Sequence, residues 1–340
     1  MSVFKWLRGR VAWPGLRALL LLGLALPGPL VQAQEPPKGA IRILVPLAVG
    51  STSDVVARLI ADNLSHLWGA SVIVDNRAGG SGRVAGSALK AAAADGTTLL
   101  LAPIAVTVLN PLLYATLNYD PVKDFAPVAQ VARYTMALAV GPAVPATTLA
   151  EFLAWARLHP TLASFGSAGV GGLGHLFGEQ IARTSGVELA HVPYTGGPRM
   201  TSDMIGGQLA AAIEATSNLI GSHRAGSIRI IAISGSERSS ALPGVQTFAE
   251  QGFPVLDGKG WLAVHAPAST PKPVVDQISR AIIDAVRSRE VSERLIGLGL
   301  EPTGTTPEAL AKIMANDTAR LVPMVKASGL SAATGSDASR

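Results

Sequence analysis

The stretch "IRILVPLAVGSTSDVVARLIADNLSHLWGASVIVD", residues 41–75, decides the fold class of this chain. Its first part, residues 41–47, is apolar and β-branched, as expected of a buried strand. Residues 54–68 carry apolar side chains every three or four positions, which predicts an amphipathic helix, and Gly69 follows as its stop. Residues 71–75 predict the next strand. A strand, a helix and a strand in this order indicate a βαβ unit with parallel strands.

The same alternation continues along the chain. A helix is expected near residues 86–94, and the final third, from Pro273 to Gly329, is mostly helical. Further apolar runs predict strands at residues 97–102, 136–141, 163–167, 189–194, 209–215, 228–234 and 261–267, with helices at 147–160 and 173–185. This rhythm predicts an α/β protein in which helices cover both faces of a parallel sheet.

The N-terminus has the three parts of a secretory signal peptide. Residues 1–17 hold four basic and no acidic side chains, residues 18–30 are mainly apolar, and Ala33 is a small residue at the expected cleavage point. The apolar run contains prolines and is shorter than the ~20 residues that a membrane-spanning helix needs. We therefore expect residues 1–33 to be removed on export to the bacterial periplasm.

Charge and cysteine content exclude several classes of function. The formal net charge is +5, and the four positive charges of the leader account for most of it. No patch of basic residues interleaved with aromatic ones remains, so nucleic-acid binding is not expected. The absence of cysteine excludes disulfides, thiolate metal sites and a cysteine nucleophile. Residues 331–340 are small and polar and predict a flexible tail.

Glycine, serine and threonine gather where predicted strands pass into predicted helices. Four junctions have this composition: residues 49–54, 76–83, 166–174 and 194–199. In open α/β sheets, ligands bind beyond the carboxyl ends of the strands, where such loops lie. Their backbone N–H groups, often at a helix start, favour an anion. Each loop alone is equally compatible with an ordinary tight turn, but four at equivalent junctions favour a binding cleft.

One of these junctions also spells a dinucleotide-binding fingerprint. Gly169, Gly171 and Gly174 match G-x-G-x-x-G ahead of a predicted helix. The preceding strand is short and polar, however, and the next acidic residue, Glu188, lies nearer than the ~20 residues typical of the fingerprint. A cradle for a small anion is therefore favoured over a nicotinamide site, and no cofactor is expected.

The junctions, in this order, resemble those of the Bug-type (TctC-like) substrate-binding receptors of tripartite tricarboxylate transporters. The resemblance rests on matching stretches that include "IRILVPLAVGSTSDVVARLIADNL" (41–64), "VIVDNRAGGSGRVAG" (72–86), "HVPYTGG" (191–197) and "WLAVHAPASTPKPVV" (261–275). With the other matching stretches, the resemblance extends over nearly the whole mature chain, from about residue 41 to residue 329.

The resemblance implies a periplasmic binding protein fold of type II, in which two doubly wound α/β lobes close on a ligand. The first lobe would comprise residues 36–137 and 258–330, and the second residues 138–257. The ligand would be a small carboxylate (a dicarboxylate, tricarboxylate, acidic amino acid or aromatic acid) held by backbone amides and hydroxyls of the loops. The receptor would act as a monomer and deliver its ligand to the membrane permease subunits of a transporter.

Carried over by position, the resemblance places ligand-binding residues on loops of both lobes. In the first lobe these are Gly50, Ser51, Thr52, Asp54, Ala78, Gly79, Ser81 and Thr107. In the second lobe they are Ser167, Gly169, Gly172, Tyr194, Thr195, Gly196, Asp203 and Glu214. Ser51 stands where relatives usually have glycine, and the apolar residues around Thr107 favour a ligand less polar than citrate. Two roles stay open: Arg83 is either a solvated helix start or a carboxylate contact, and Glu214 either meets a ligand ammonium group or is an ordinary paired acid.

Catalysis is not indicated by the sequence. The six histidines lack metal-binding spacing, and no metal site is expected. Neither a nucleophile elbow nor a P-loop occurs, and no base partner is evident for Ser81 or Ser167. We therefore predict a receptor that is not an enzyme. Two alternatives stay open: an exported enzyme on the same scaffold, and a ligand sensor that acts on the outer domain of a two-component kinase.

Overall fold

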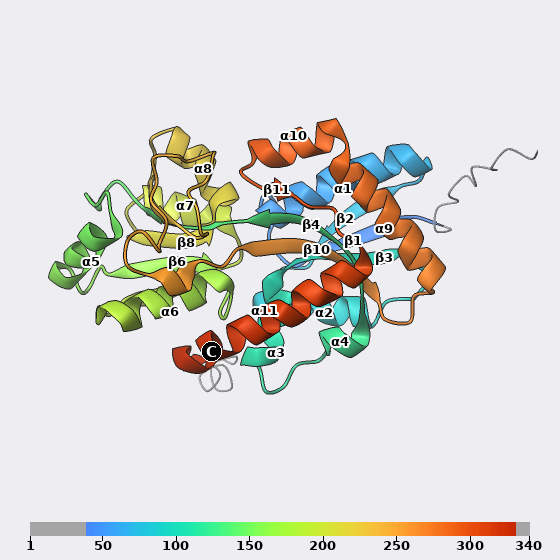
Figure 1. Cartoon of the computed structure of the whole chain (residues 1–340), viewed down its shortest axis with the longest axis horizontal. Coiled ribbons are helices and arrows are strands. Elements are labelled where there is room, and N and C mark those ends of the chain that lie inside the picture. Colours follow the sequence, from blue (N-terminus) through green and yellow to red (C-terminus); the bar gives the residue numbers. More distant parts are fainter. Residues whose placement is uncertain (1–38, 331–340) are drawn as a thin grey trace, which may run out of the picture. The chain divides into compact units, whose positions relative to one another are not determined.

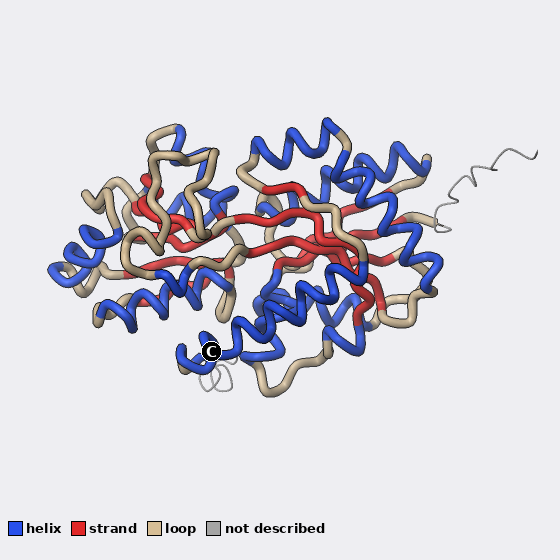
Figure 2. The backbone as a smooth tube through the Cα atoms, viewed as in Figure 1, coloured by secondary structure: helices blue, strands red, loops and turns tan. Residues whose placement is uncertain are grey.

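The computed structural model describes residues 39–330, whose strands form two sheets (Figure 1). The predicted signal peptide and the predicted tail at residues 331–340 lie outside the described residues. Helices flank the strands of both sheets (Figure 2). The α/β class predicted from the sequence is confirmed. Below, lobe 1 denotes the first sheet with its loops and helices, and lobe 2 the second.

The first sheet has six strands in the order β11-β4-β10-β3-β1-β2. They are β1 (Ile41–Val45), β2 (Val72–Asn76), β3 (Thr98–Pro103), β4 (Phe125–Tyr134), β10 (Gly260–Pro267) and β11 (Glu301–Pro302). β1 pairs in parallel with both β2 and β3, as the opening stretch predicts. β10 lies between β3 and β4 and runs antiparallel to both, so the sheet is mixed and not parallel throughout.

The second sheet has five strands in the order β7-β6-β8-β5-β9. They are β5 (Met136–Val140), β6 (Ser164–Ala168), β7 (Ala190–Tyr194), β8 (Ala211–Ala215) and β9 (Arg229–Ile233). β6 pairs in parallel with β7 and β8, whereas β5 runs antiparallel to β8 and β9. The strand that enters each sheet from the other lobe, β10 or β5, runs antiparallel to both of its neighbours, and β11 also runs antiparallel to β4.

The helices within residues 39–330 are α1 (Thr52–Trp68), α2 (Arg83–Lys90), α3 (Asn110–Leu113), α4 (Pro121–Asp124), α5 (Leu149–Leu158), α6 (Leu173–Ser185), α7 (Gly197–Ile205), α8 (Thr216–Arg224), α9 (Lys272–Arg287), α10 (Arg289–Gly297) and α11 (Pro307–Ser328). None of these helices combines the length and the apolarity that a bilayer crossing requires.

α1 shows how the local sequence sets the bounds of an element. The Asp54 N–H donates to the Ser51 hydroxyl, which caps the helix start. Gly69, with φ of 59°, ends the helix in the left-handed conformation that glycine adopts readily. Val56 and Ile60 of the apolar stripe are fully buried. The helix therefore begins two residues earlier than its apolar pattern predicts, because Ser51 is the cap.

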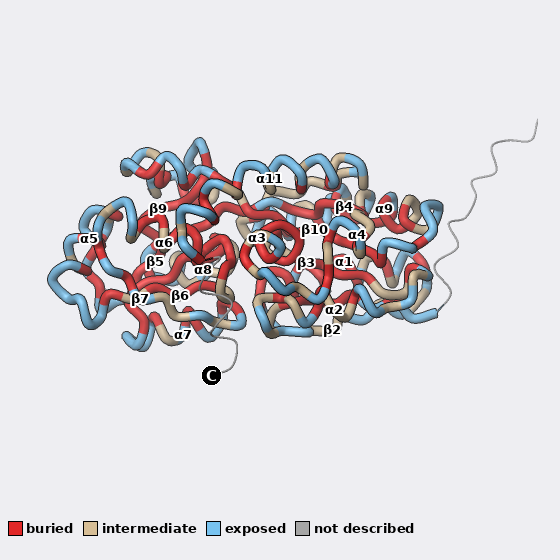
Figure 3. Tube along the Cα trace, turned by 90° about the horizontal axis from the view of Figure 1, so that it is seen from below, coloured by how far each residue is buried: buried red, intermediate tan, exposed pale blue. Residues whose placement is uncertain are grey.

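Side-chain alternation places helices on both faces of the first sheet. Ile43 and Val45 of β1 belong to the buried cluster that contains the apolar stripe of α1, whereas Leu44 clusters with Leu89 of α2. Since successive side chains of a strand point to opposite faces, α1 and α2 cover opposite faces of this sheet. Figure 3 shows the outcome: strand segments are largely buried, and the outer turns of the helices are exposed.

The second sheet is covered in the same way. Leu138 of β5 lies in the buried cluster that contains Phe177 of α6. The next residue, Ala139, lies in a separate cluster with Met204 of α7 and Leu219 of α8. Both sheets are therefore doubly wound, with helices on both faces.

The chain passes between the sheets at Thr135, which separates β4 from β5. The hydroxyl oxygens of Thr135 and Thr216 are 2.7 Å apart, and the Thr216 N–H donates to the Thr135 carbonyl over 2.9 Å. The Met136 N–H donates to the Ser234 hydroxyl, just past β9, over 2.9 Å. The expected lobe bounds stay a prediction, while the strands change sheet at Thr135.

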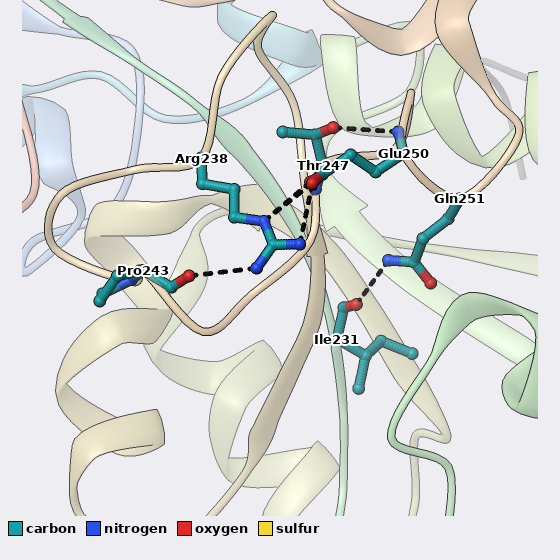
Figure 4. Close-up of polar contacts among 6 residues, drawn as sticks. All are labelled: Ile231, Arg238, Pro243, Thr247, Glu250 and Gln251. Carbon is teal, nitrogen blue, oxygen red and sulfur yellow. Dashed lines mark hydrogen bonds and ion pairs between the residues drawn. The ribbon is translucent and has the colours of Figure 1, made fainter.

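A long connection, residues 234–259, leads from β9 back to β10. Figure 4 shows the ion pair that pins it, with Arg238 Nη2 2.8 Å from Glu250 Oε1. The hydrogen bond from Arg238 lowers the pKa of Glu250 to about 2. Gln251 Nε2 donates to the carbonyl of Ile231 over 2.9 Å and fixes the connection to β9.

Two helix glycines allow the packing of α6 to be tested. A Cβ at Gly178 would overlap the ring of Phe165 on β6, whereas a Cβ at Gly221 of α8 would meet nothing within 4 Å. We expect Gly178→Ala to lower the free energy of unfolding by ~1–3 kcal/mol, as overpacking does. The matched Gly221→Ala should raise it by ~0.5–1 kcal/mol, as expected for alanine in place of a helical glycine. Urea unfolding measures both, and equal effects would contradict the packing described.

Candidate ligand-binding site

The loops of both lobes enclose a cavity of about 460 Å³. Half of the predicted site residues line it: Thr52, Gly79, Ser81, Gly169, Gly172, Tyr194, Thr195 and Glu214. Arg83, whose role the sequence left open, also lines it. Tyr114, Tyr134, His175 and Asn218 line it as well but are not among the predicted contacts. Of these four residues, only Asn218 could have been suspected from the sequence, because it lies in the first turn of the helix that follows Glu214.

The other predicted residues lie outside the lining of this cavity: Gly50, Ser51, Asp54, Ala78, Thr107, Ser167, Gly196 and Asp203. Gly50 lines a second cavity, of about 390 Å³, together with Thr52 and residues of α7 and α8. Gly196 is the residue before α7, and Thr107 is buried with its hydroxyl unpartnered.

Ser51 and Asp54 are bound within their own helix start. The Ser51 hydroxyl is the cap of α1, and Asp54 Oδ2 accepts from the Gly50 N–H over 2.9 Å. Arg58 Nη2 lies 2.9 Å from Asp54 Oδ1. Burial raises the pKa of Asp54, but hydrogen bonds from Arg58, Gly50 and Asn76 outweigh it and hold the pKa below its usual value. The carboxylate thus stabilises the loop instead of facing the cavity.

Asp203 supports a cavity residue from behind. The Tyr194 hydroxyl donates to Asp203 Oδ2 over 2.9 Å, and Arg199 lies 3.9 Å from the same oxygen. Burial and the bond to Asp203 raise the pKa of Tyr194 to about 12. Asp203 therefore orients Tyr194, which lines the cavity, without lining it itself.

Ser167 has a base partner that the sequence did not reveal. Its hydroxyl lies 2.8 Å from His191 Nε2, and the His191 ring stacks on His175 with centroids 3.6 Å apart. Burial, with a contribution from His175, lowers the pKa of His191 to about 3, so the ring is neutral at physiological pH. The expectation that Ser167 lacks a base is therefore wrong. Ser167 is only 1% exposed, however, and neither Ser167 nor His191 is among the residues that line the cavity.

Three helices begin at the cavity, which is a property of its loops. Thr52, Arg83 and Leu173 are the first residues of α1, α2 and α6, and all three line it. No side chain caps α2 or α6. Helix starts leave backbone N–H groups unpaired and carry the positive end of the helix dipole. Both the unpaired N–H groups and the positive end of the helix dipole favour an anion in the cavity.

The loop before α2 has an unusual backbone. Gly79, Gly80 and Gly82 all have positive φ, and Ser81, with φ of 56°, is the one non-glycine residue with positive φ within residues 39–330. Two N–H groups at this turn are bonded within the loop, since Gly82 donates to the Gly79 carbonyl over 3.0 Å and Arg83 donates to the Gly80 carbonyl. A serine in this conformation is strained, and contacts around it must maintain it.

Hydrogen bonds across the cavity join the two lobes. The Ser81 hydroxyl donates to the Val170 carbonyl over 2.7 Å. The Thr52 hydroxyl donates to Asn218 Oδ1 over 2.6 Å, and the Ala48 N–H donates to the Thr195 carbonyl over 3.2 Å. These bonds close the two sets of loops on each other and enclose the space between them.

Glu214 is the acidic residue of the lining, at the end of β8. It is 6% exposed, and its Oε1 accepts from the Ala215 N–H over 2.8 Å. Its Oε2 is buried without a hydrogen-bond partner. Burial raises its pKa to about 6, against the opposing hydrogen bonds of Ala215, Asn218 and Ala168.

Arg83 is the basic residue of the lining, on the lobe 1 side. Its Nε donates to the Gly80 carbonyl over 2.8 Å, and its guanidinium carbon lies 4.1 Å from the centroid of the Tyr114 ring. Most of the remaining wall is apolar and includes Ile104 and Leu262. Within residues 39–330, no group of three or more histidine, aspartate or glutamate side chains is arranged to hold a metal.

Comparison with known proteins identifies relatives over most of the chain. The model of the tripartite tricarboxylate transporter family receptor matches residues 56–330. Protein BugT of Bordetella pertussis is 32% identical over 311 residues, which are 90% of this chain and 94% of BugT. A UPF0065 protein of Bordetella bronchiseptica is 35% identical over 290 residues, 84% of this chain and 86% of that protein.

Solved structures share the architecture. An adipate-bound R. palustris protein, Rpa4515, has a TM-score of 0.83 and 32% identity, covering 86% of this chain and 98% of that one. MatC of Rhodopseudomonas palustris, with bound malate, has a TM-score of 0.81 and 28% identity, covering 85% and 99%. The periplasmic binding protein BugD has a TM-score of 0.83 and 27% identity, covering 86% and 99%.

The raised pKa of Glu214 predicts a pH-dependent effect of Glu214→Gln on stability. Below pH 4.5, its ordinary pKa, the carboxyl is protonated both in the folded and in the unfolded ligand-free chain. As the pH rises through about 6, the folded chain must give up a proton that it holds more tightly, so the wild type loses ~2 kcal/mol of stability. Glutamine does not titrate. The stability of Glu214→Gln relative to wild type should therefore rise by ~2 kcal/mol between pH 4 and pH 8.

Urea unfolding of the ligand-free proteins at several pH values measures this difference. Glu188→Gln, which changes an exposed glutamate of lobe 2, is the matched control and should give a flat difference. A flat difference for Glu214→Gln as well would contradict a buried, unpaired carboxylate.

Proposed function

Since this chain belongs to the tripartite tricarboxylate transporter receptor family, a family of periplasmic solute-binding proteins, we propose that it captures a small carboxylate between its lobes and delivers it to the membrane subunits of such a transporter. The observation that carries this proposal is the enclosed cavity between the lobes, at which three helices begin.

The carboxylate is held mainly by backbone N–H groups. The donors are those N–H groups of the positive-φ loop of residues 79–82 and of the first turns of α2 and α6 that the protein itself does not use, since no side chain caps either helix. Such donors bind an anion without a fixed counter-charge, since the helix dipole and the hydrogen bonds act together. Two compared R. palustris proteins hold adipate and malate, which supports a carboxylate as the ligand.

Closure of the lobes retains the ligand. Ser81 and Val170 come from different lobes, and so do Thr52 and Asn218, yet each pair is hydrogen-bonded across the cavity. A ligand that touches both sets of loops stabilises this closed arrangement relative to an open one. The closed form is then the species that a membrane partner recognises.

Ligand-induced stabilisation tests the proposal directly. After unfolding and refolding to remove bound ligand, the protein is heated with members of a panel of mono-, di- and tricarboxylates, amino acids and NAD. A ligand at 100 times its dissociation constant should raise the free energy of unfolding by ~2.7 kcal/mol. We expect at least one carboxylate to raise the melting temperature. A shift with NAD alone would contradict the receptor and favour a dinucleotide site at Gly169–Gly174.

The variant Ser81→Gly separates the effect of lobe closure on ligand affinity from the effect of this residue on folding stability. Glycine tolerates the positive φ of this position, so the ligand-free protein should be at least as stable as wild type. Loss of the bond to Val170 removes ~1 kcal/mol from the closed form, which should weaken carboxylate binding about fivefold. Calorimetric titration measures this, with Ser202→Ala as control, because the exposed Ser202 bonds only within its own helix. Unchanged affinity in Ser81→Gly would show that the cross-lobe bond does not contribute to binding.

A further inference from the structure

We infer that the ligand carries an ammonium group as well as a carboxylate, and is therefore an amino acid whose ammonium group pairs with Glu214. Its carboxylate would lie on the opposite, lobe 1 side, at the loop of residues 79–82 and Arg83. This inference rests on the proposed function and narrows its ligand class from carboxylates in general to zwitterions.

The charged residues of the cavity divide between the lobes. Among the described residues that line it, Arg83 is the one lysine or arginine and Glu214 the one aspartate or glutamate. Arg83 begins α2 of lobe 1, whereas Glu214 lies on β8 of lobe 2. His175 also lines the cavity, but its Nδ1 accepts from the Gly171 N–H, and its Nε2 lies 3.3 Å from Glu179. It therefore has neither nitrogen free for a ligand.

Glu214 has one carboxylate oxygen, Oε2, for which the described protein provides no well-placed hydrogen-bond donor, although Asn218 and Ala168 lie close enough to lower the pKa of the carboxyl. Oε1 accepts from the Ala215 N–H, while Oε2 is buried without a donor. An unpaired buried carboxylate is costly, so such a group in a native structure calls for a partner. The partner must be a donor, and a positively charged donor gives the strongest hydrogen bond to a carboxylate.

The surroundings of Glu214 offer it no positive charge. The neighbouring titratable group is Tyr134, whose own pKa is raised by burial and by Glu214. Its other neighbours are the neutral Asn218 and the backbone of Ala168 and Ala215. Arg83 pairs instead with the Gly80 carbonyl and the Tyr114 ring. A ligand ammonium group would supply both the missing donor and the missing charge.

Glu214 also determines where the ligand carboxylate can bind. Its pKa responds to the N–H of Ala168, at the end of β6, which leads into α6. A ligand carboxylate at the start of α6 would therefore meet the Glu214 carboxylate, so of the donors in the proposed site the inference keeps only those of lobe 1. The N–H donors of lobe 1 and the neighbouring Arg83 bring no negative charge near the ligand carboxylate. The ligand is thereby oriented, with its carboxylate toward lobe 1 and its ammonium group toward lobe 2.

A dicarboxylate fits this arrangement less well. Its second carboxylate would face Glu214, and the two could share a site only after taking up a proton. Dicarboxylate binding would then tighten as the pH falls toward 5. Amino-acid binding should not tighten, because protonation of Glu214 removes the charge that holds the ammonium group.

The test compares three pairs of probes: in two pairs the acid lacks the ammonium group, and in the third a second carboxylate replaces it. Calorimetric titration of the ligand-stripped protein at pH 7.5 uses L-phenylalanine against 3-phenylpropionate, L-leucine against 4-methylpentanoate, and 6-aminohexanoate against adipate. In at least one pair the amino form should bind about tenfold more tightly, or better, as a charge-assisted bond to a buried carboxylate provides. If in every pair the form without the ammonium group binds as tightly or more tightly, the inference is wrong.

The variant Glu214→Gln tests whether a preference for the amino form depends on the Glu214 carboxylate. We expect the variant to lose about tenfold or more in affinity for the preferred amino form and to keep its affinity for the partner acid within about twofold. Glu188→Gln, exposed on the same lobe, should keep the full preference. An equal loss for both forms would mean that Glu214 only positions the loops, which overturns the inference.

The outcomes separate this inference from the proposed function. If carboxylates bind without any preference for an ammonium group, only the inference fails. Adipate affinity that rises between pH 8 and pH 5 in the wild type but not in Glu214→Gln would identify a protonated Glu214 and a dicarboxylate, and would also overturn it. If neither acids nor amino acids bind, both the inference and the proposed function fail.

Discussion

The passage of the chain between its two sheets at Thr135 is the constraint on which the rest of the structure depends. One residue separates β4 from β5, so the two sheets stay close together where the chain crosses from one to the other. Buried hydrogen bonds between Thr135 and Thr216, and between Met136 and Ser234, hold this crossing together. Because the loops after the parallel strands of both sheets meet there, the cavity is a consequence of the crossing and not of any one loop.

Polar side chains around the cavity are divided between the fold and the ligand. Asp54 is held by Arg58 and a helix start, Asp203 by Tyr194, and Ser167 by His191. These groups maintain the loops and are satisfied without a ligand. Among the described side chains that line the cavity, one oxygen of Glu214 is the buried polar atom left without a hydrogen-bond partner.

Much of the fold could be predicted because its signals are local. Residues 173–185 form α6 as their pattern predicts, and glycine stops such as Gly69 mark helix ends through their own φ angles. β4 escaped prediction because Pro127 interrupts its pattern. That proline is accommodated at an irregularity in the pairing of β4 with β10, which only the partner strand reveals.

The sequence by itself determined the fold class, the family and the loops that line the cavity, since periodicity, glycine position and matching stretches are all read along the chain. Only the tertiary structure decided which side chains line the cavity. Ser81 meets Val170 across 89 residues, and Thr52 meets Asn218 across 166. Such distant partners determine whether a buried polar group has a hydrogen-bond partner. The sequence alone therefore does not distinguish an unpaired buried carboxylate, such as that of Glu214, from a paired one.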